Sequence, residues 1–190
     1  MNRVGWRWYA LWMLTFLGFP AGGASAILLF GSVDGALSGA LAGGVAGAIV
    51  GAGQWMVLRR HPGVSAAWIA VTAAGLALGD GFGAAITGAG TGIGGLLVTG
   101  LVCSVAVGTF QWIVLRRIVR GAGIWPMVVA VAWPLGWTVT WAVGVDVERG
   151  YAVFGSTGAL VFAAITGAAM LLVLRGQENR MMRPDDLEKG

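Results

Sequence analysis

One acidic side chain, Asp80, lies well inside a long apolar stretch of the chain, in the run LGDGFG. A helix that begins at Trp68 places Asp80 about 18 Å from the membrane surface, past the middle of a hydrocarbon core about 30 Å thick. A carboxylate at this depth is costly, and it could bind a cation or relay a proton. The alternative is that Asp80 caps a broken helix or meets water in an outer vestibule.

Two glutamines form a second candidate site, because each lies one helical turn before a pair of arginines. Gln54 belongs to QWMVLRR and Gln111 to QWIVLRR. An amide that faced lipid would be left without hydrogen bonds, so both side chains should face the protein interior and bond to each other or to backbone. With Asp80 they are candidates to line a ligand or ion path. Met170 occupies the related position further along, so a ring of three glutamines does not form, and packing is the alternative role.

A stripe of glycines follows the second apolar segment, with one glycine at every fourth residue. Its members are Gly35, Gly39, Gly43, Gly47 and Gly51. Residues four apart share one face of a helix, and a glycine face lets another backbone approach closely in a membrane. We expect this face to pack against the first span or between hairpins. A seam for self-association and the wall of a narrow pore are the alternatives.

The composition indicates the class of protein that must position these side chains. Apolar residues make up 57% of the chain, charged residues 11%, and the mean hydropathy is +0.82. These values are typical of a polytopic membrane protein. The net charge of +4 comes from arginines at the ends of apolar segments, so it favours a membrane orientation over nucleic-acid binding.

The same residue inventory argues against an enzyme. The chain has one cysteine, Cys103, inside an apolar segment and one histidine, His61, in a predicted loop. Neither a disulfide framework nor a cluster of metal ligands can be assembled from them. Serine, histidine and acidic residues do not combine into a triad within the spans either. We therefore expect no catalytic residues, no metal and no cofactor.

A repeated motif sets the predicted architecture. The run GAGQWMVLRR at Gly51–Arg60 returns as GTFQWIVLRR at Gly108–Arg117 and weakens to GAAMLLVLRG at Gly167–Gly176. Each copy ends an apolar stretch that is long enough for a hairpin of two spans and that opens at a tryptophan, namely Trp8, Trp68 or Trp125.

The predicted fold is an all-α polytopic membrane protein with six transmembrane helices, arranged as three repeated hairpins with approximate threefold pseudo-symmetry. A single transmembrane domain covers residues 1–176, with repeats at about 6–60, 64–117 and 121–176, and residues 177–190 form a cytoplasmic tail. The N-terminal segment is similar to a secretory signal, but its apolar run continues to Phe30, so we expect it to remain as the first span.

Three stretches are expected to depart from regular helix. Pro20 should kink the first span. The glycine-rich stretch Gly79–Gly95 should turn near Thr91 and have irregular or kinked flanks. A polar turn, VDVERG at 145–150, should join the last two spans.

The arginines predict the orientation. In this arrangement every arginine and lysine except Arg149 falls on one side of the membrane. Since basic residues are enriched in cytoplasmic loops, both termini should be cytoplasmic, and we expect a multi-pass protein of the bacterial inner membrane.

The repeated QWxVLRR step resembles that of a loose group of uncharacterised bacterial multi-pass membrane proteins whose hairpins end in similar steps. The resemblance covers Trp8 to Arg175 and implies the repeat and the topology, with no assigned activity. In bulk the chain is also similar to the substrate-binding subunits of energy-coupling-factor vitamin transporters.

The sequence therefore favours a non-enzymatic accessory or scaffold subunit of the membrane that packs through glycine-rich helix faces. Its expected partners are membrane lipids and either further copies of itself or a larger membrane complex, with no nucleic acid. The alternative is a component of a small-solute or ion transporter or channel that uses Asp80.

Overall fold

The structure is a computed structural model that describes residues 5–61, 63–144 and 156–181. This part of the chain is helical and contains no strand. Its elements are α1 (Trp6–Met13), the 3-10 helix η1 (Leu14–Leu17), α2 (Gly18–Phe30), α3 (Ala36–Leu58), α4 (Ala67–Thr87), α5 (Ile93–Leu115), the 3-10 helix η2 (Ala122–Ile124), α6 (Trp125–Ala142) and α7 (Ser156–Met181).

Within the described residues, six helical segments are long and apolar enough to cross a membrane. They are Trp6–Phe30, Ala36–Leu58, Ala67–Thr87, Ile93–Leu115, Ala122–Ala142 and Ser156–Gln177. Helices suit this setting because all of their backbone groups bond within the segment, where lipid offers no partner. The predicted all-α fold with six transmembrane helices is confirmed.

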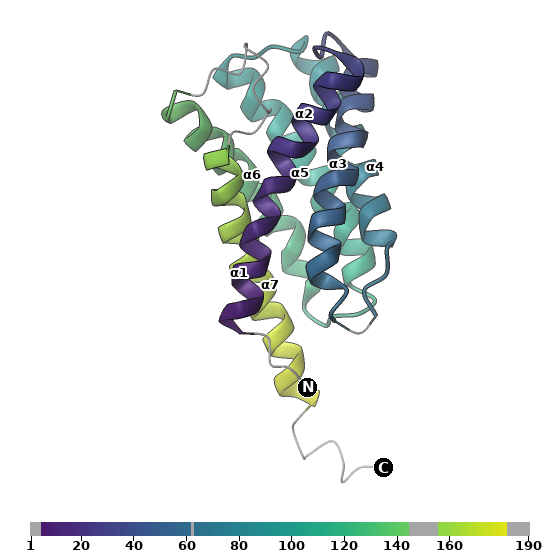
Figure 1. Cartoon of the computed structure of the whole chain (residues 1–190), viewed down its shortest axis with the longest axis vertical. Coiled ribbons are helices and arrows are strands. Elements are labelled where there is room, and N and C mark those ends of the chain that lie inside the picture. Colours follow the sequence, from purple (N-terminus) through teal and green to yellow (C-terminus); the bar gives the residue numbers. More distant parts are fainter. Residues whose placement is uncertain (1–4, 62, 145–155, 182–190) are drawn as a thin grey trace.

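The helices pack in the order in which they follow one another, from α2 on α3 through to α6 on α7. The last helix then returns to the first, since α7 contacts α1 and η1 (Figure 1). Two hydrogen bonds join α1 to α7. The Tyr9 hydroxyl donates to the Ala164 carbonyl at 3.3 Å, and Trp12 Nε1 donates to Thr166 Oγ1 at 3.2 Å. The result is a closed bundle. Its threefold pseudo-symmetry stays a prediction.

The first span loses regular α-helical geometry in η1, the turn just before Pro20. Proline has no backbone N–H to donate to the carbonyl of the residue four positions earlier, which is Phe16 in η1. The tighter 3-10 turn is one way in which a helix accommodates such an interruption. The irregularity therefore lies where the sequence predicted a kink.

The glycine-rich stretch is more regular than expected. α4 continues without a break through Asp80 to Thr87, and α5 begins at Ile93. The expectation of irregular flanks was wrong, because a helix break within lipid leaves backbone groups unsatisfied and close packing of the glycines offsets their low helix propensity. The turn itself begins at Gly88, whose φ of 63° is left-handed and ends α4.

Every contact between neighbouring helices includes a glycine whose missing side chain makes room for the other helix. A Cβ atom added at Gly22 would lie 2.9 Å from Ala46 Cα, and one at Gly79 would lie 2.5 Å from Cys103 Cα. The same close approach occurs between α3 and α4 at Gly43, between α5 and α6 at Gly100, between α6 and α7 at Gly158, and between α7 and α1 at Gly167. Glycine packing therefore builds the bundle at each of its seams.

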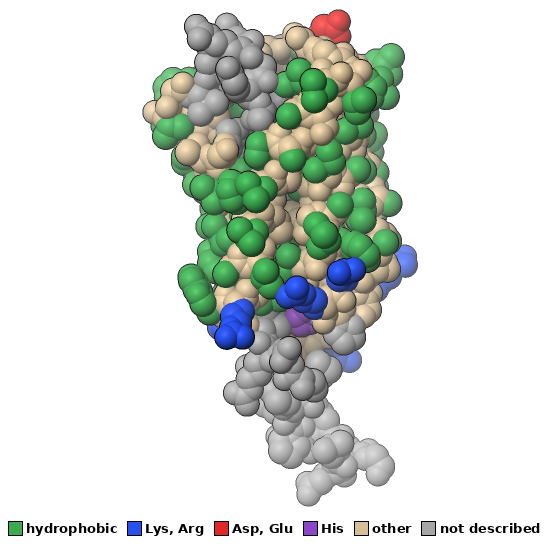
Figure 2. Space-filling view, in the orientation of Figure 1, with side chains coloured by type: hydrophobic (Ala, Val, Ile, Leu, Met, Phe, Trp, Pro, Cys, Tyr) green, Lys and Arg blue, Asp and Glu red, His purple; other side chains and the backbone are tan. Residues whose placement is uncertain are grey.

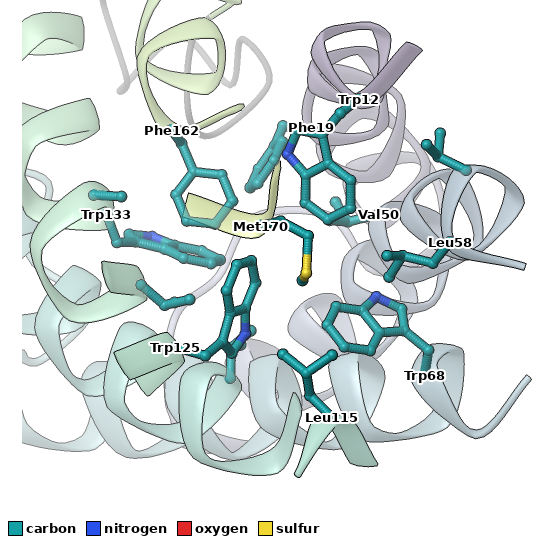
Figure 3. Close-up of a cluster of buried hydrophobic side chains, with 14 of the residues drawn as sticks. Trp12, Phe19, Val50, Leu58, Trp68, Leu115, Trp125, Trp133, Phe162 and Met170 are labelled. Atoms are coloured by element: carbon teal, nitrogen blue, oxygen red, sulfur yellow. The ribbon is translucent and has the colours of Figure 1, made fainter. Parts of the chain in front are cut away.

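The interior is filled by large side chains. Trp12, Trp68 and Trp125 are fully buried, and the ring of Trp125 lies 6.3 Å from that of Trp12 and 6.1 Å from that of Trp68 between centroids. Figure 3 shows these tryptophans with the buried Met170 among them. Further along the bundle, Phe19, Trp133 and Phe162 form a second aromatic cluster.

The surface has the pattern of a protein in a bilayer. Large apolar side chains such as Leu28, Leu37 and Met127 are exposed around the bundle. Figure 2 shows hydrophobic side chains along the bundle, arginine side chains gathered at one end, and an acidic side chain at the other. The fold and surface thus define a multi-pass helical membrane protein.

Two predictions fall at the edges of the described residues. α7 continues as helix to Met181, so the beginning of the predicted tail at 177–190 is part of the last helix. The predicted turn at 145–150 and the rest of the tail lie outside the described residues.

Candidate functional site

The two predicted glutamines meet inside the bundle. Gln111 Nε2 of α5 donates to Gln54 Oε1 of α3 at 3.1 Å, and both side chains are at most 2% exposed. The helix between them, α4, contributes Thr72, whose hydroxyl accepts a second hydrogen bond from Gln111 Nε2 at 3.0 Å. Of the two predicted kinds of partner, each other or backbone, the amides bond to each other, and with Thr72 they link three helices.

Each glutamine also accepts a hydrogen bond from a buried tryptophan at the start of the next hairpin. Trp68 Nε1 donates to Gln54 Oε1 at 3.0 Å, and Trp125 Nε1 donates to Gln111 Oε1 at 2.9 Å. An indole N–H buried in an apolar interior needs an acceptor, and the glutamine that closes the preceding span supplies it. The repeated Gln and Trp positions thus form one recurring bond.

The hydroxyl of Thr72 completes this arrangement, which we call the glutamine network and define as Gln54, Trp68, Thr72, Gln111 and Trp125. Thr72 Oγ1 donates to the Trp68 carbonyl at 2.7 Å, so the hydroxyl both gives and receives a bond. All five side chains are at most 2% exposed. Buried polar groups that satisfy one another in this way rigidify a core and fix the register of its helices.

In the third copy of the sequence motif, at Gly167–Gly176, a threonine just before the motif position of the glutamines accepts the tryptophan hydrogen bond. Met170 occupies the position of the glutamines, and Trp12 Nε1 donates instead to Thr166 Oγ1, which passes a bond to the Phe162 carbonyl at 2.7 Å. Trp12, rather than Trp8, therefore makes the bond that resembles those of Trp68 and Trp125, and the assignment of Trp8 as the opening residue of the first hairpin stays a prediction. Trp8 stacks on Trp12 with centroids 5.3 Å apart. The nearly even spacing of Trp12, Trp68 and Trp125 was the signal for this shared bond.

Asp80 lies in the middle of α4, between α3 and α5. Cys103 Sγ of α5 donates to Asp80 Oδ1 at 2.9 Å. On the α3 side, a Cβ atom added at Gly43 would lie 2.7 Å from Asp80 Oδ2, so the carboxyl group occupies the space that this glycine leaves. Because α4 is continuous here, Asp80 does not cap a broken helix, and that alternative was wrong.

Two threonines of α4 on either side of Asp80 form hydrogen bonds with other groups. Thr72 belongs to the glutamine network, and Thr87 Oγ1 donates to the Gly83 carbonyl at 2.8 Å. Thr72 and Asp80 are two helical turns apart, a rise of about 12 Å along α4. Asp80 therefore does not join Gln54 and Gln111 in one site. The sequence did not reveal Cys103 as its partner, because this contact depends on the rotation of α5 against α4.

The glycine stripe of α3 lies against α4 at four of its five positions. A Cβ atom added at Gly39, Gly43 or Gly47 would lie within 2.8 Å of a backbone carbonyl oxygen of α4. These oxygens belong to Asp80, Leu76 and Thr72, respectively. Gly51 approaches the Thr72 side chain, whereas Gly35 precedes the helix and has nothing within 4 Å. This face is covered within the chain, between the first and second hairpins.

Among the described residues, no group of three or more histidine, cysteine, aspartate or glutamate side chains is placed to hold a metal ion. The chain matches no protein-family model, no curated protein and no solved structure. The resemblance to bacterial multi-pass proteins with QWxVLRR steps therefore stays a prediction. What the geometry defines is a membrane bundle with an internally bonded polar core and a separate carboxyl–thiol pair.

Proposed function

We propose that this chain is a non-enzymatic integral membrane protein that acts as an accessory or scaffold subunit. The observation that supports the proposal is the glutamine network. Its polar groups bond to one another inside a packed aromatic core, which is the arrangement of a rigid structural element. A subunit of this kind would contact its partner through its lipid-facing sides, since the α3 glycines already pack on α4.

The proposed setting is the inner membrane of a bacterium, with both termini in the cytoplasm. The exposed arginines of the described residues support this orientation, because they lie near the ends of the spans at the side where α1 begins and α7 ends. Basic residues at one face of a multi-pass protein favour the cytoplasmic side.

The mass of the gently solubilised assembly tests the accessory role. Native mass spectrometry with lipids retained should show a stoichiometric complex with a different membrane protein. A lone monomer, or a homo-oligomer that carries a bound solute or ion, would contradict the accessory role and favour transport.

The second candidate is a component of a small-solute or ion transporter or channel, and the position of Asp80 favours it. This carboxyl group lies within a membrane span, and its hydrogen-bond partner is a thiol.

The Asp80→Asn variant separates the two proposals. Asparagine keeps the size of the side chain and an acceptor oxygen for Cys103 Sγ but cannot carry a negative charge. A scaffold should assemble normally with this variant and keep its partner. A transporter that uses the carboxylate should also assemble but should lose transport of its solute or ion in proteoliposomes. Asp34→Asn, in the exposed loop before α3, is the matched control and should change neither result.

A further inference from the structure

Two arginines at the charged end of the bundle are each held against a tryptophan. The guanidinium carbon of Arg59 lies 5.5 Å from the centre of the Trp55 ring, and that of Arg116 lies 4.8 Å from the centre of the Trp112 ring. The members of each pair are four residues apart, so they share one face of α3 or α5. They occupy the same position in the two QWxVLRR motifs, so the arrangement is a repeated one.

The tryptophans hold these arginines at a defined place. Trp55 and Trp112 are partly buried and pack against the hydrophobic core, whereas both arginines are exposed. A cation over an aromatic face is attracted by the ring, which reduces the freedom of a long side chain. A guanidinium carries five N–H donors, so one that lies over a ring still has donors for a second partner.

Exposed arginine side chains gather at this end of the bundle. Exposed arginines here are Arg7, Arg59, Arg60, Arg116, Arg117, Arg120 and Arg175. Asp34 lies in the loop at the opposite end of α3, and Asp80 lies inside a span. A negatively charged partner is therefore expected at this face.

The depth of the two pairs identifies that partner as a lipid. Trp55 and Trp112 lie in the last turn of a membrane span, where tryptophan sits among lipid headgroups. The phosphate groups of the bilayer lie at the same level, and a guanidinium binds phosphate oxygens with two parallel hydrogen bonds. Anionic lipids are attracted to such juxtamembrane arginines.

We propose that the Trp55–Arg59 and Trp112–Arg116 pairs are two equivalent binding sites for the headgroup phosphate of an anionic phospholipid. The following arginines, Arg60 and Arg117, are also exposed but belong to neither pair. The third copy has Leu171 four residues before Arg175, so it lacks the tryptophan and forms no site of this kind. The inference does not depend on the accessory role, because it concerns the isolated chain.

Lipid retention tests the proposal. The full chain is reconstituted in nanodiscs that contain phosphatidylglycerol and phosphatidylcholine, and native mass spectrometry counts the lipids that stay bound after release. The expected result is two retained phosphatidylglycerol molecules in the wild-type protein. The double variant Arg59→Gln with Arg116→Gln should weaken their binding by about tenfold or more, the loss of a charge-assisted bidentate bond.

The matched control is Arg60→Gln with Arg117→Gln, which removes the same charge from the neighbouring positions. It should weaken binding much less, since it leaves Arg59 and Arg116 over their tryptophan rings. Trp55→Leu with Trp112→Leu keeps every charge and should still weaken binding. Equal losses in the two arginine variants, or no preference for phosphatidylglycerol over phosphatidylcholine, would overturn the proposal and leave a diffuse attraction to the charged face.

Discussion

Gln111 of α5 makes more hydrogen bonds between helices than any other side chain of the glutamine network, because its amide bonds to side chains of α3, α4 and α6. Its partners are Gln54, Thr72 and Trp125. Interhelical hydrogen bonds in membranes contribute on average about 0.6 kcal/mol and at most about 1.7 kcal/mol each. We predict that Gln111→Met, the residue found at the third position of the repeat, lowers the free energy of unfolding by about 2 kcal/mol, from these lost bonds. Unfolding by steric trapping in bicelles would measure it.

Gln54→Met provides the comparison for this prediction. Gln54 accepts bonds from Trp68 and Gln111 through one oxygen, so the loss should be smaller than for Gln111→Met. Both changes conserve volume, which limits the contribution from packing. Equal stability of the wild type and Gln111→Met would mean that the network contributes no net energy and that the aromatic core alone holds the helices.

The contact of α3 with α4 depends on Gly43. A Cβ atom at this position would lie 2.5 Å from the Leu76 carbonyl oxygen and 2.7 Å from Asp80 Oδ2, so the two helices would have to separate. We predict that Gly43→Ala lowers the free energy of unfolding by about 1–3 kcal/mol, the usual cost of overpacking. The same steric-trapping measurement applies.

Gly53→Ala is the matched control in the same helix, because nothing lies within 4 Å of a Cβ atom there. Alanine is the better helix former by about 1 kcal/mol, so this variant should be neutral or slightly more stable. If Gly43→Ala were as stable as Gly53→Ala, the close approach of α3 and α4 would be incorrect.

The elements that the sequence predicted best are those set by local composition. Apolar length and the arginine pairs predicted the spans. The cost of an amide in lipid predicted that Gln54 and Gln111 would face the interior and bond to each other or to backbone, and they bond to each other. Features that depend on how one helix is rotated against another were missed. The bond from Cys103 to Asp80 is one, and the continuity of α4 through its glycines is another, because helix packing overrode local propensity there.

The orientation of the whole bundle yields the last prediction. Ser32 and Ala66 are exposed in loops at opposite ends of α3, whereas the native Cys103 is 1% exposed and should not react. If the arginine end is cytoplasmic, Ser32→Cys should be labelled by a membrane-impermeant maleimide on intact spheroplasts. Ala66→Cys should be labelled only after the membrane is opened. Neither substitution changes an arginine, so the charge pattern that sets the orientation is kept. Labelling of Ala66→Cys on intact spheroplasts, with Ser32→Cys labelled only after opening, would place the charged face outside. It would contradict the proposed topology while leaving the helix packing intact.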